Sequence, residues 1–423
     1  MLHGAMTGMW MRLKEEVRST AGGLPRVYWY LWWGTLVNRL GSFVVPFLAL
    51  YLTRERGFTV EQAGLTASLH GGGAVLSGLV GGMVADRLGR RTALIAGLWL
   101  GSLGMLFLGF AREPLQIAVA AALLGFLGEM YRPAVAAAIS DVVPAKDRAR
   151  AFGLLYWVVN LGFSIAVPLA GLASRFGFQA LFIADACTTF LYGVVVWWKV
   201  PETRPTFAAA PGSERRGFSV APFVDRVFLA FALPVLLTAF IFFQSNVTLP
   251  MDLSARGISP TTFGLVLGVN GVMIVLVQPF MARVLTRVRR SVALAWASAL
   301  TGLGFGLYAL TPDAGLAALA VLVWTLGEIA MAPVASAVVA DLAPPEERGT
   351  YQGAYSTLWA MAACTAPALG GWVLGRHGSQ ALWGTCLVLG VSAALWHLAI
   401  GGARRRRLET LRQTRPEVST ALE

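Results

Sequence analysis

The stretch ALLGFLGEMYRPAVAAAISDVVPAKDRARAFG covers residues 122–153, and a second stretch, TLGEIAMAPVASAVVADLAPPEERGTYQG, covers residues 325–353. They share a Gly-Glu step, an Asp, a Pro, an Arg and a closing Gly at intervals of 199 or 200 residues. In a chain of 423 residues, this interval indicates two similar halves. Each copy also carries one carboxylate in an otherwise apolar run, Glu129 or Glu328. A charged side chain in hydrocarbon costs at least ~2.5 kcal/mol, so inside a membrane it marks function by default.

The composition places the chain in a lipid membrane. Of its residues, 56% are hydrophobic and 13% are charged, whereas a soluble domain has about one quarter charged residues. The net charge of +12 does not indicate nucleic acid, because the basic residues are spread over loops without a groove-reading motif. Cys187, Cys364 and Cys386 lie in apolar runs without ligand spacing, which favours neither disulfides nor a metal site. We therefore predict an all-α, multi-pass membrane protein.

Twelve apolar runs are long enough to span a membrane core, which takes about 20 helical residues. We predict spans at 27–52, 60–85, 92–111, 115–139, 151–173, 178–199, 227–250, 260–285, 291–311, 315–340, 350–374 and 379–401. They divide the chain into a segment at 1–26, a six-helix bundle at 27–199, a linker at 200–226, a second six-helix bundle at 227–401 and a basic tail at 402–423. The first run is too long for a signal-peptide core, so we expect no cleavable signal.

The distribution of lysine and arginine predicts the orientation of the chain. Of the 34 basic residues, 26 fall in the first segment, the tail and the loops on the same side, and six fall in the loops on the other side. Because cytoplasmic loops carry the basic excess, we expect both termini in the cytoplasm and the chain in a bacterial-type inner membrane. The tail is expected to be partly disordered and to contact anionic lipid headgroups.

The loop after the second span carries a recognisable motif, GMVADRLGRR, at residues 82–91. It resembles the G-x-x-x-D-R-x-G-R-R/K signature of the major facilitator superfamily, and a weaker copy, PFMARVLTRVRR, occupies residues 279–290. The resemblance implies two pseudo-symmetric six-helix bundles. It also implies gating roles for Asp86, Arg87, Gly89 and Arg90, which in this family latch the halves on the cytoplasmic side. A loop that only sets topology would explain the arginines but not the acid.

Two further stretches point to a branch of that family. GFSIAVPLAG at 162–171 and CTAPALGG at 364–371 are similar to the family's antiporter motif, G-x-x-x-G-P-x-x-G-G, which is associated with exporters. They depart from it at Ala166, Val167, Ala170 and Ala366. No nucleotide-binding G-x-x-x-x-G-K-[ST] loop is present in the sequence. The resemblance therefore implies proton-coupled export of small amphipathic or drug-like molecules, with the proton gradient as energy source and no cofactor.

Intramembrane polar residues supply a candidate site. At a rise of 1.5 Å per residue, Arg39, Glu129 and Glu328 each lie about 18 to 20 Å into their spans, near the midplane, where repeat-built transporters bind substrate. We predict that Glu129 and Glu328 carry the proton coupling. Arg39 and Arg132 are expected to hold Glu129 ionised, whereas Glu328 has no basic residue within one turn and is expected to accept a proton more readily.

Other polar residues are expected to complete the cavity or to pack helices. The predicted polar contacts of the cavity, besides Arg39 and Arg132, are Asn38, Asn160, Gln244, Asn246 and Asn270. Asp185 and His70 are expected to serve helix packing. The drug-antiporter branch often carries an arginine in the fourth helix at the position of Ala121, so any coupling here must use different residues.

Several alternatives stay open at this stage. Arg39 and Glu129 could form an ion pair that only holds two helices together. An importer or a lipid or lysolipid transporter of the same fold would share these features. A receptor would not need a carboxylate in each half, and an intramembrane enzyme should show a nucleophile with a base or a metal cluster. The expected partners are a small-molecule substrate, protons and membrane lipids, and the chain is expected to act as a monomer.

Overall fold

The computed structural model describes residues 22–144, 147–204, 221–285, 287–311, 313–344 and 348–413. Within these residues the chain is helical and has no strand. Eleven of the described helical stretches are long and apolar enough to cross a membrane. The last of them, Tyr351–Ala399, has 49 residues and turns back at Gly378, where φ is 78°, so it crosses twice. The predicted all-α fold with twelve spans is confirmed.

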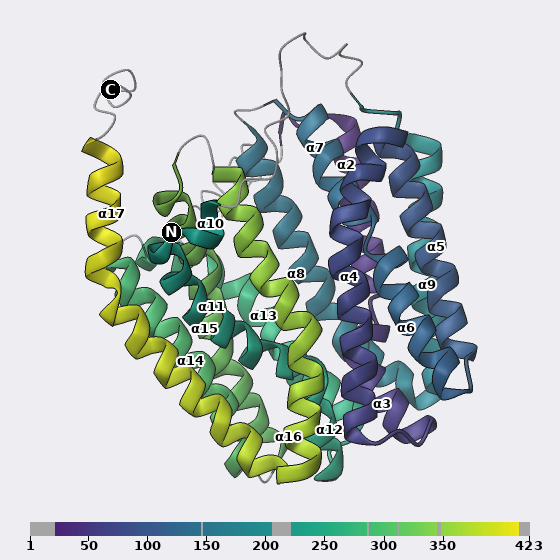
Figure 1. The fold of residues 1–423 in the computed structure, drawn as a ribbon. Coiled ribbons are helices and arrows are strands. Elements are labelled where there is room, and N and C mark those ends of the chain that lie inside the picture. The colour runs from purple at the N-terminus through teal and green to yellow at the C-terminus, as the bar shows by residue number, and fades with distance from the viewer. Residues whose placement is uncertain are drawn as a thin grey trace, which may run out of the picture.

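The helices follow one another in two bundles (Figure 1). The first bundle contains α2 (Arg26–Leu40), α3 (Val44–Glu55), α4 (Val60–Leu88), α5 (Arg90–Phe110), α6 (Pro114–Gly128), α7 (Tyr131–Val142), α8 (Arg148–Ala173), η2 (Ser174–Phe176) and α9 (Phe178–Lys199). The second contains α10 (Ala221–Val224), α11 (Arg226–Phe242), η3 (Phe243–Asn246), α12 (Thr248–Ala255), α13 (Pro260–Leu285), α14 (Arg290–Leu307), η4 (Tyr308–Leu310), α15 (Ala314–Leu342), α16 (Arg348–Ala399) and α17 (Gly401–Gln413). Most of the predicted linker, 205–220, lies outside the described residues.

Three spans predicted as continuous helices are interrupted. The first breaks between α2 and α3, the fourth between α6 and α7, and the seventh at η3. At the break in the fourth span Pro133 has no N–H to bond the carbonyl of Glu129 four residues earlier, although Pro333 at the same place of the repeat leaves α15 continuous. The N–H of Arg132 bonds that carbonyl instead, at 3.2 Å, in a tighter turn. The interruption places Glu129 at the end of α6 rather than inside a regular helix.

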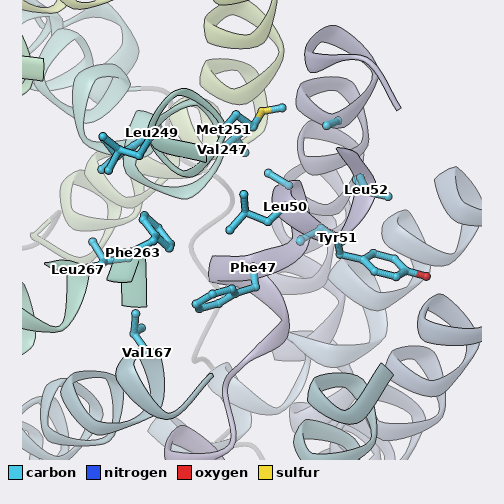
Figure 2. Packing of buried hydrophobic residues seen from close by; sticks show 14 of the residues in the cluster. Phe47, Leu50, Tyr51, Leu52, Val167, Val247, Leu249, Met251, Phe263 and Leu267 are labelled. Carbon is cyan, nitrogen blue, oxygen red and sulfur yellow. The ribbon is translucent and has the colours of Figure 1, made fainter. Parts of the chain in front are cut away.

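Among the residues that the structure describes, the two halves share a hydrophobic core at one end of the molecule only. We call the end that carries Arg26, residues 200–204 and α17 the terminus end, and the opposite end, with the turn in α16, the loop end (Figure 1). At the loop end a single hydrophobic cluster contains residues of both halves. Phe47 of the first half and Phe263 of the second make an edge contact with ring centroids 5.6 Å apart. Figure 2 shows both side chains in this cluster.

At the terminus end the hydrophobic clusters are separate. One contains residues of the first half only, including Tyr28, Tyr131 and Tyr192. The other contains residues of the second half only, including Phe228 and Tyr351. The halves therefore share a core at the loop end and have separate cores at the terminus end.

Small residues bring the halves close at the loop end, where α4 packs against α16 and α8 packs against α13. A Cβ added at Gly64 would lie 2.5 Å from the carbonyl oxygen of Pro367, and one at Gly264 would lie 2.7 Å from that of Val167. Backbones that approach this closely are typical of membrane helix pairs with small residues. The stretches similar to the antiporter motif thus form the contact between the halves.

The structure describes the first part of the basic tail. Residues Gly401–Gln413 form α17, which continues from the last span, and 414–423 lie outside the described residues. Arg404 is only 6% exposed, and its Nη2 donates to Ser291 Oγ at 2.9 Å. Arg407 contacts Asp225 at 3.4 Å. These contacts with the second bundle stabilise the helix.

Candidate functional site

A cavity of about 380 Å³ lies between the halves. Apolar side chains such as Phe163 and Met105 form much of its wall, and η3 and α16 close it from the second half. Its polar lining residues are Asn38, Arg39, Ser42, His70, Glu129, Tyr131, Arg132, Asp185, Thr189 and Asn246. An apolar wall with a few charged groups suits a molecule that is part apolar and part polar.

Glu129 and Arg132 form an ion pair in this cavity. Arg132 Nε lies 2.5 Å from Glu129 Oε2, across the break between α6 and α7. The side chain of Arg132 is 52% exposed and that of Glu129 is 22% exposed, so both can be reached from the cavity. Each charge therefore neutralises the other while remaining accessible to a bound molecule.

Arg39, which was predicted to hold Glu129 ionised, makes its described hydrogen bond to another residue of the same cavity. Arg39 Nη2 donates to Tyr131 Oη at 2.9 Å, and Tyr131 Oη donates to Asn38 Oδ1 at 3.0 Å. Asn38 Nδ2 donates to Thr189 Oγ1 at 2.8 Å. These hydrogen bonds join α2, α7 and α9, and the guanidinium of Arg39 lies in the cavity wall.

Asp185 and His70 also line the cavity, although the sequence suggested packing roles. Asp185 Oδ2 accepts the backbone N–H groups of Phe43 and Val44, both at 3.1 Å. These are the donors at the start of α3 that have no partner within the helix. Asp185 therefore holds the break in the first span. Its Oδ1 has no hydrogen-bond partner in the described part of the chain. The sequence could have indicated Asp185 as a site residue, because an acid inside a membrane span is functional by default.

Glu328 faces a second, smaller cavity of about 210 Å³. Tyr156 of α8 lines it from the first half, and the remaining lining comes from the second half, with Phe242, Met331 and Trp359 among its apolar members. Asn270 Nδ2 donates to Glu328 Oε2 at 2.6 Å. Among the residues that the structure describes, Glu328 makes no ion pair. This agrees with the sequence analysis, which found no basic residue within one helical turn of Glu328.

Asn160 and Gln244 do not line either cavity, in contrast to their prediction as cavity residues. Asn160 Nδ2 donates to the carbonyl of Tyr156 in its own helix at 2.9 Å. Gln244 Nε2 donates to the carbonyl of Ala366 at 3.3 Å and so fixes η3 against α16. The sequence shows that these residues are polar, but it does not show which way they face.

The motif loop of the first half is built around the start of α5. The side chain of Asp86 lies outside the described residues, Arg87 is exposed, and Gly89 has φ 107°, in the region that favours glycine. Arg90 Nε lies 3.0 Å from Asp141 Oδ2, and Arg90 Nη1 donates to the carbonyl of Ala85 at 2.8 Å. These contacts of Arg90 lie within the first half.

The same ion pair recurs in the second half between Arg290 and Asp341, each 200 residues after its counterpart. Sequence reasoning registered the repeated acid but missed its partner. The 200-residue interval between Arg90 and Arg290 was the signal that could have found it.

Comparison with known proteins agrees with this architecture. The family model described as Major Facilitator Superfamily matches residues 31–254 and 236–422. The chain is 27% identical over 357 residues to a Na(+), Li(+), K(+)/H(+) antiporter of Planococcus maritimus, covering 77% of this chain and 84% of that one. It is 24% identical over 341 residues to multidrug resistance protein MdtH of Enterobacter sp. (strain 638), covering 79% and 83%.

Solved structures share the fold at lower identity. The peptide transporter POT in complex with sulfate gives a TM-score of 0.74 at 18% identity, over 92% of this chain and 96% of that one. A bacterial homologue of the human lysosomal transporter Spinster, in an inward-facing and unoccupied conformation, gives 0.71 at 15% identity, over 92% and 98%.

Proposed function

Because the chain belongs to the major facilitator superfamily of membrane transporters, we propose that it exports small amphipathic molecules by alternating access, coupled to protons. The observation that carries the proposal is that the two halves surround their carboxylates differently. Glu129 pairs with the cation Arg132, whereas the described partner of Glu328 is the neutral amide of Asn270. The resemblance to an antiporter and to a multidrug resistance protein supports export. The proton gradient is the proposed energy source, and no cofactor takes part.

The packing of the halves supports an assignment of this conformation. The basic excess lies at the terminus end, which supports a cytoplasmic position for that end in the inner membrane that we propose as the location. With this orientation the shared core lies on the outer side and the separate cores lie on the inner side. We therefore assign the conformation as inward-facing, in which an exporter working as a monomer takes up its substrate.

The surroundings of Glu328 suggest how transport and proton movement are linked. The cavity beside Glu328 is lined by apolar residues and by the neutral polar residues Tyr156, Thr238 and Thr301, and a lone charge is disfavoured in such surroundings. A proton on Glu328 removes that charge, and so does a bound cationic substrate. The two therefore compete for the same carboxylate, and competition of this kind makes each lower the affinity for the other. If the site opens to one side of the membrane and then to the other, this competition leads to exchange of substrate for protons.

The test is flux in proteoliposomes with and without an imposed pH gradient. The substrate panel contains an amphipathic cation, a dipeptide and monovalent metal cations. We expect the gradient to drive the amphipathic cation uphill. Glu328→Gln, which imitates the protonated acid, should abolish uphill movement and leave downhill movement intact. Thr385→Ala, which changes an exposed polar residue of α16 that lines neither cavity, serves as the control.

Two results would contradict the proposal. A Glu328→Gln protein that still concentrates substrate would remove Glu328 from the coupling. Movement of substrate in the same direction as protons would make the protein an importer, which is the alternative that the fold also allows.

A further inference from the structure

A third cavity, of about 340 Å³, lies at the terminus end of the second half, away from the proposed transport path. It lies between α14, α15 and α17. Four arginines line it: Arg289, Arg290, Arg404 and Arg405. The single acid in its lining, Asp341, already pairs with Arg290. The cavity therefore carries an excess of positive charge that the described protein groups do not balance.

Arg404 is the buried member of this set. It is 6% exposed, and its guanidinium lies 5.8 Å from the ring centroid of Phe231. Its Nη2 donates to Ser291 Oγ and to the carbonyl of His397, at 2.9 and 2.8 Å. Its Nε and Nη1 have no hydrogen-bond partner within the described part of the chain. A buried cation with unused donors is costly unless an anion accompanies it.

The charge of Arg404 persists at neutral pH. Burial lowers the pKa of Arg404 to about 10, which still leaves the guanidinium protonated. The cavity wall therefore contains a permanent cation.

The start of α14 adds a second group of donors. The helix has 18 residues, and its N-cap residue, Arg289, makes no side-chain capping hydrogen bond. The first N–H groups of a helix lack partners within it, and the helix dipole favours an anion there. A phosphate group at a helix start can use both effects.

The first half shows what occupies the equivalent place. α5 begins at Arg90, 200 residues before Arg290. The carboxylate of Glu202 accepts the backbone N–H groups of Arg90 and Arg91 at 2.8 and 3.3 Å. The residue 200 positions after Glu202 is Gly402, which has no side chain to offer. The first half thus supplies its own anion at this helix start, and the second half has arginines and an open cavity instead.

We propose that the cavity between α14, α15 and α17 binds a phosphate group from outside the chain, which takes the place that the Glu202 carboxylate has in the first half. Arginine forks match phosphate oxygens well. α17 follows the last span at once, so the cavity lies at the membrane surface. The phosphate can therefore come from an anionic phospholipid headgroup or from a soluble phosphate.

The experiment measures the thermal unfolding midpoint of the full-length protein in nanodiscs, because a ligand that binds the folded state raises it. One arm compares phosphatidylcholine discs with discs that also contain phosphatidylglycerol. The other arm adds inorganic phosphate to phosphatidylcholine discs, with sodium chloride at matched ionic strength as reference. We expect a rise in at least one arm. A rise only with phosphatidylglycerol assigns the site to a lipid headgroup, and a rise only with phosphate assigns it to a soluble compound.

Three variants locate the effect. Arg404→Gln removes the buried cation and should weaken binding about tenfold, as loss of a charged hydrogen bond does. Gly402→Glu restores the carboxylate of the first half and should abolish the rise without removing any arginine. Its side chain has room, because no atom lies within 4 Å of a Cβ built at Gly402. Arg406→Gln removes an exposed charge of the same helix outside the cavity lining, and it should keep the rise.

Three outcomes would overturn the proposal. The first is a wild-type protein that responds in neither arm. The second is a Gly402→Glu protein that responds as the wild type does. The third is an Arg406→Gln protein that loses the response as fully as Arg404→Gln, since the effect would then depend on net charge alone.

Discussion

The two halves place a carboxylate at the same position of the repeat but surround it differently. In the first half Glu129 contacts Arg132 at 2.5 Å, at a break between two helices. In the second half Glu328 lies inside the continuous helix α15 and accepts a hydrogen bond from the side-chain amide of Asn270. A salt bridge keeps its charge balance in every state, whereas an acid with a neutral partner must acquire a cation or a proton. The repeat therefore duplicates the position of the acid but not its task.

The largest effect is expected when the second half is made to resemble the first. Asn270→Lys would place an ammonium group beside Glu328 and hold it ionised. An opposite charge at this distance shifts a protonation equilibrium by about tenfold or more, so gradient-driven accumulation should fall at least about tenfold while downhill flux persists. Proteoliposome flux measures both. Asn270→Met, of similar size but neutral, is the matched control and should retain most accumulation. Equal accumulation by the two variants would show that the charge state of Glu328 is irrelevant.

A smaller effect is expected when the first half is made to resemble the second. Arg132→Gln leaves Glu129 with a neutral partner, so this acid should also take up a proton when the site is empty. Binding of a cationic substrate should then release about one more proton per protein than in the wild type. A pH-indicator dye in weakly buffered detergent solution measures the release. Unchanged release would mean that another group, such as Arg39, balances the charge of Glu129.

The smallest effects concern the paired ion bridges of the repeat. The Arg90 and Asp141 side chains are 13% and 15% exposed, whereas those of Arg290 and Asp341 are 47% and 29% exposed. Exposed pairs contribute about 0 to 1 kcal/mol, while loss of a buried charged hydrogen bond costs about 1.5 to 3 kcal/mol.

Arg90→Gln should therefore lower the thermal unfolding midpoint more than Arg290→Gln does. Tryptophan fluorescence in detergent follows both unfolding curves. Equal losses would indicate that water reaches the Arg90 pair as freely as the Arg290 pair.

The parts of the fold that repeat or follow hydrophobicity were predictable from the sequence. Length and composition gave the spans, and the 200-residue interval identified the two halves and the acids at Glu129 and Glu328. The spacing of three residues also predicted Arg132 beside Glu129, and the two side chains do meet, although the helix is interrupted between them.

The parts that depend on partners far along the chain were not predictable. The break in the first span is held by Asp185, 141 residues or more away in sequence from the backbone groups it accepts. Arg39 donates to Tyr131, which lies 92 residues away in sequence. Arg404 is buried by docking of α17, and hydropathy alone assigns a run of arginines to solvent. In each case tertiary packing overrides a correct local pattern.

The contact between the halves at the loop end has a consequence for how such proteins diverge. Gly64 and Gly264 each face a backbone carbonyl oxygen of the other half. This oxygen is the same whichever amino acid stands at the opposing position. Complementarity of this kind depends on the absence of side chains rather than on their identity. The side chains that line the cavities can therefore be exchanged during evolution without changing this contact between the halves. One contact surface is thus compatible with cavities of quite different chemistry.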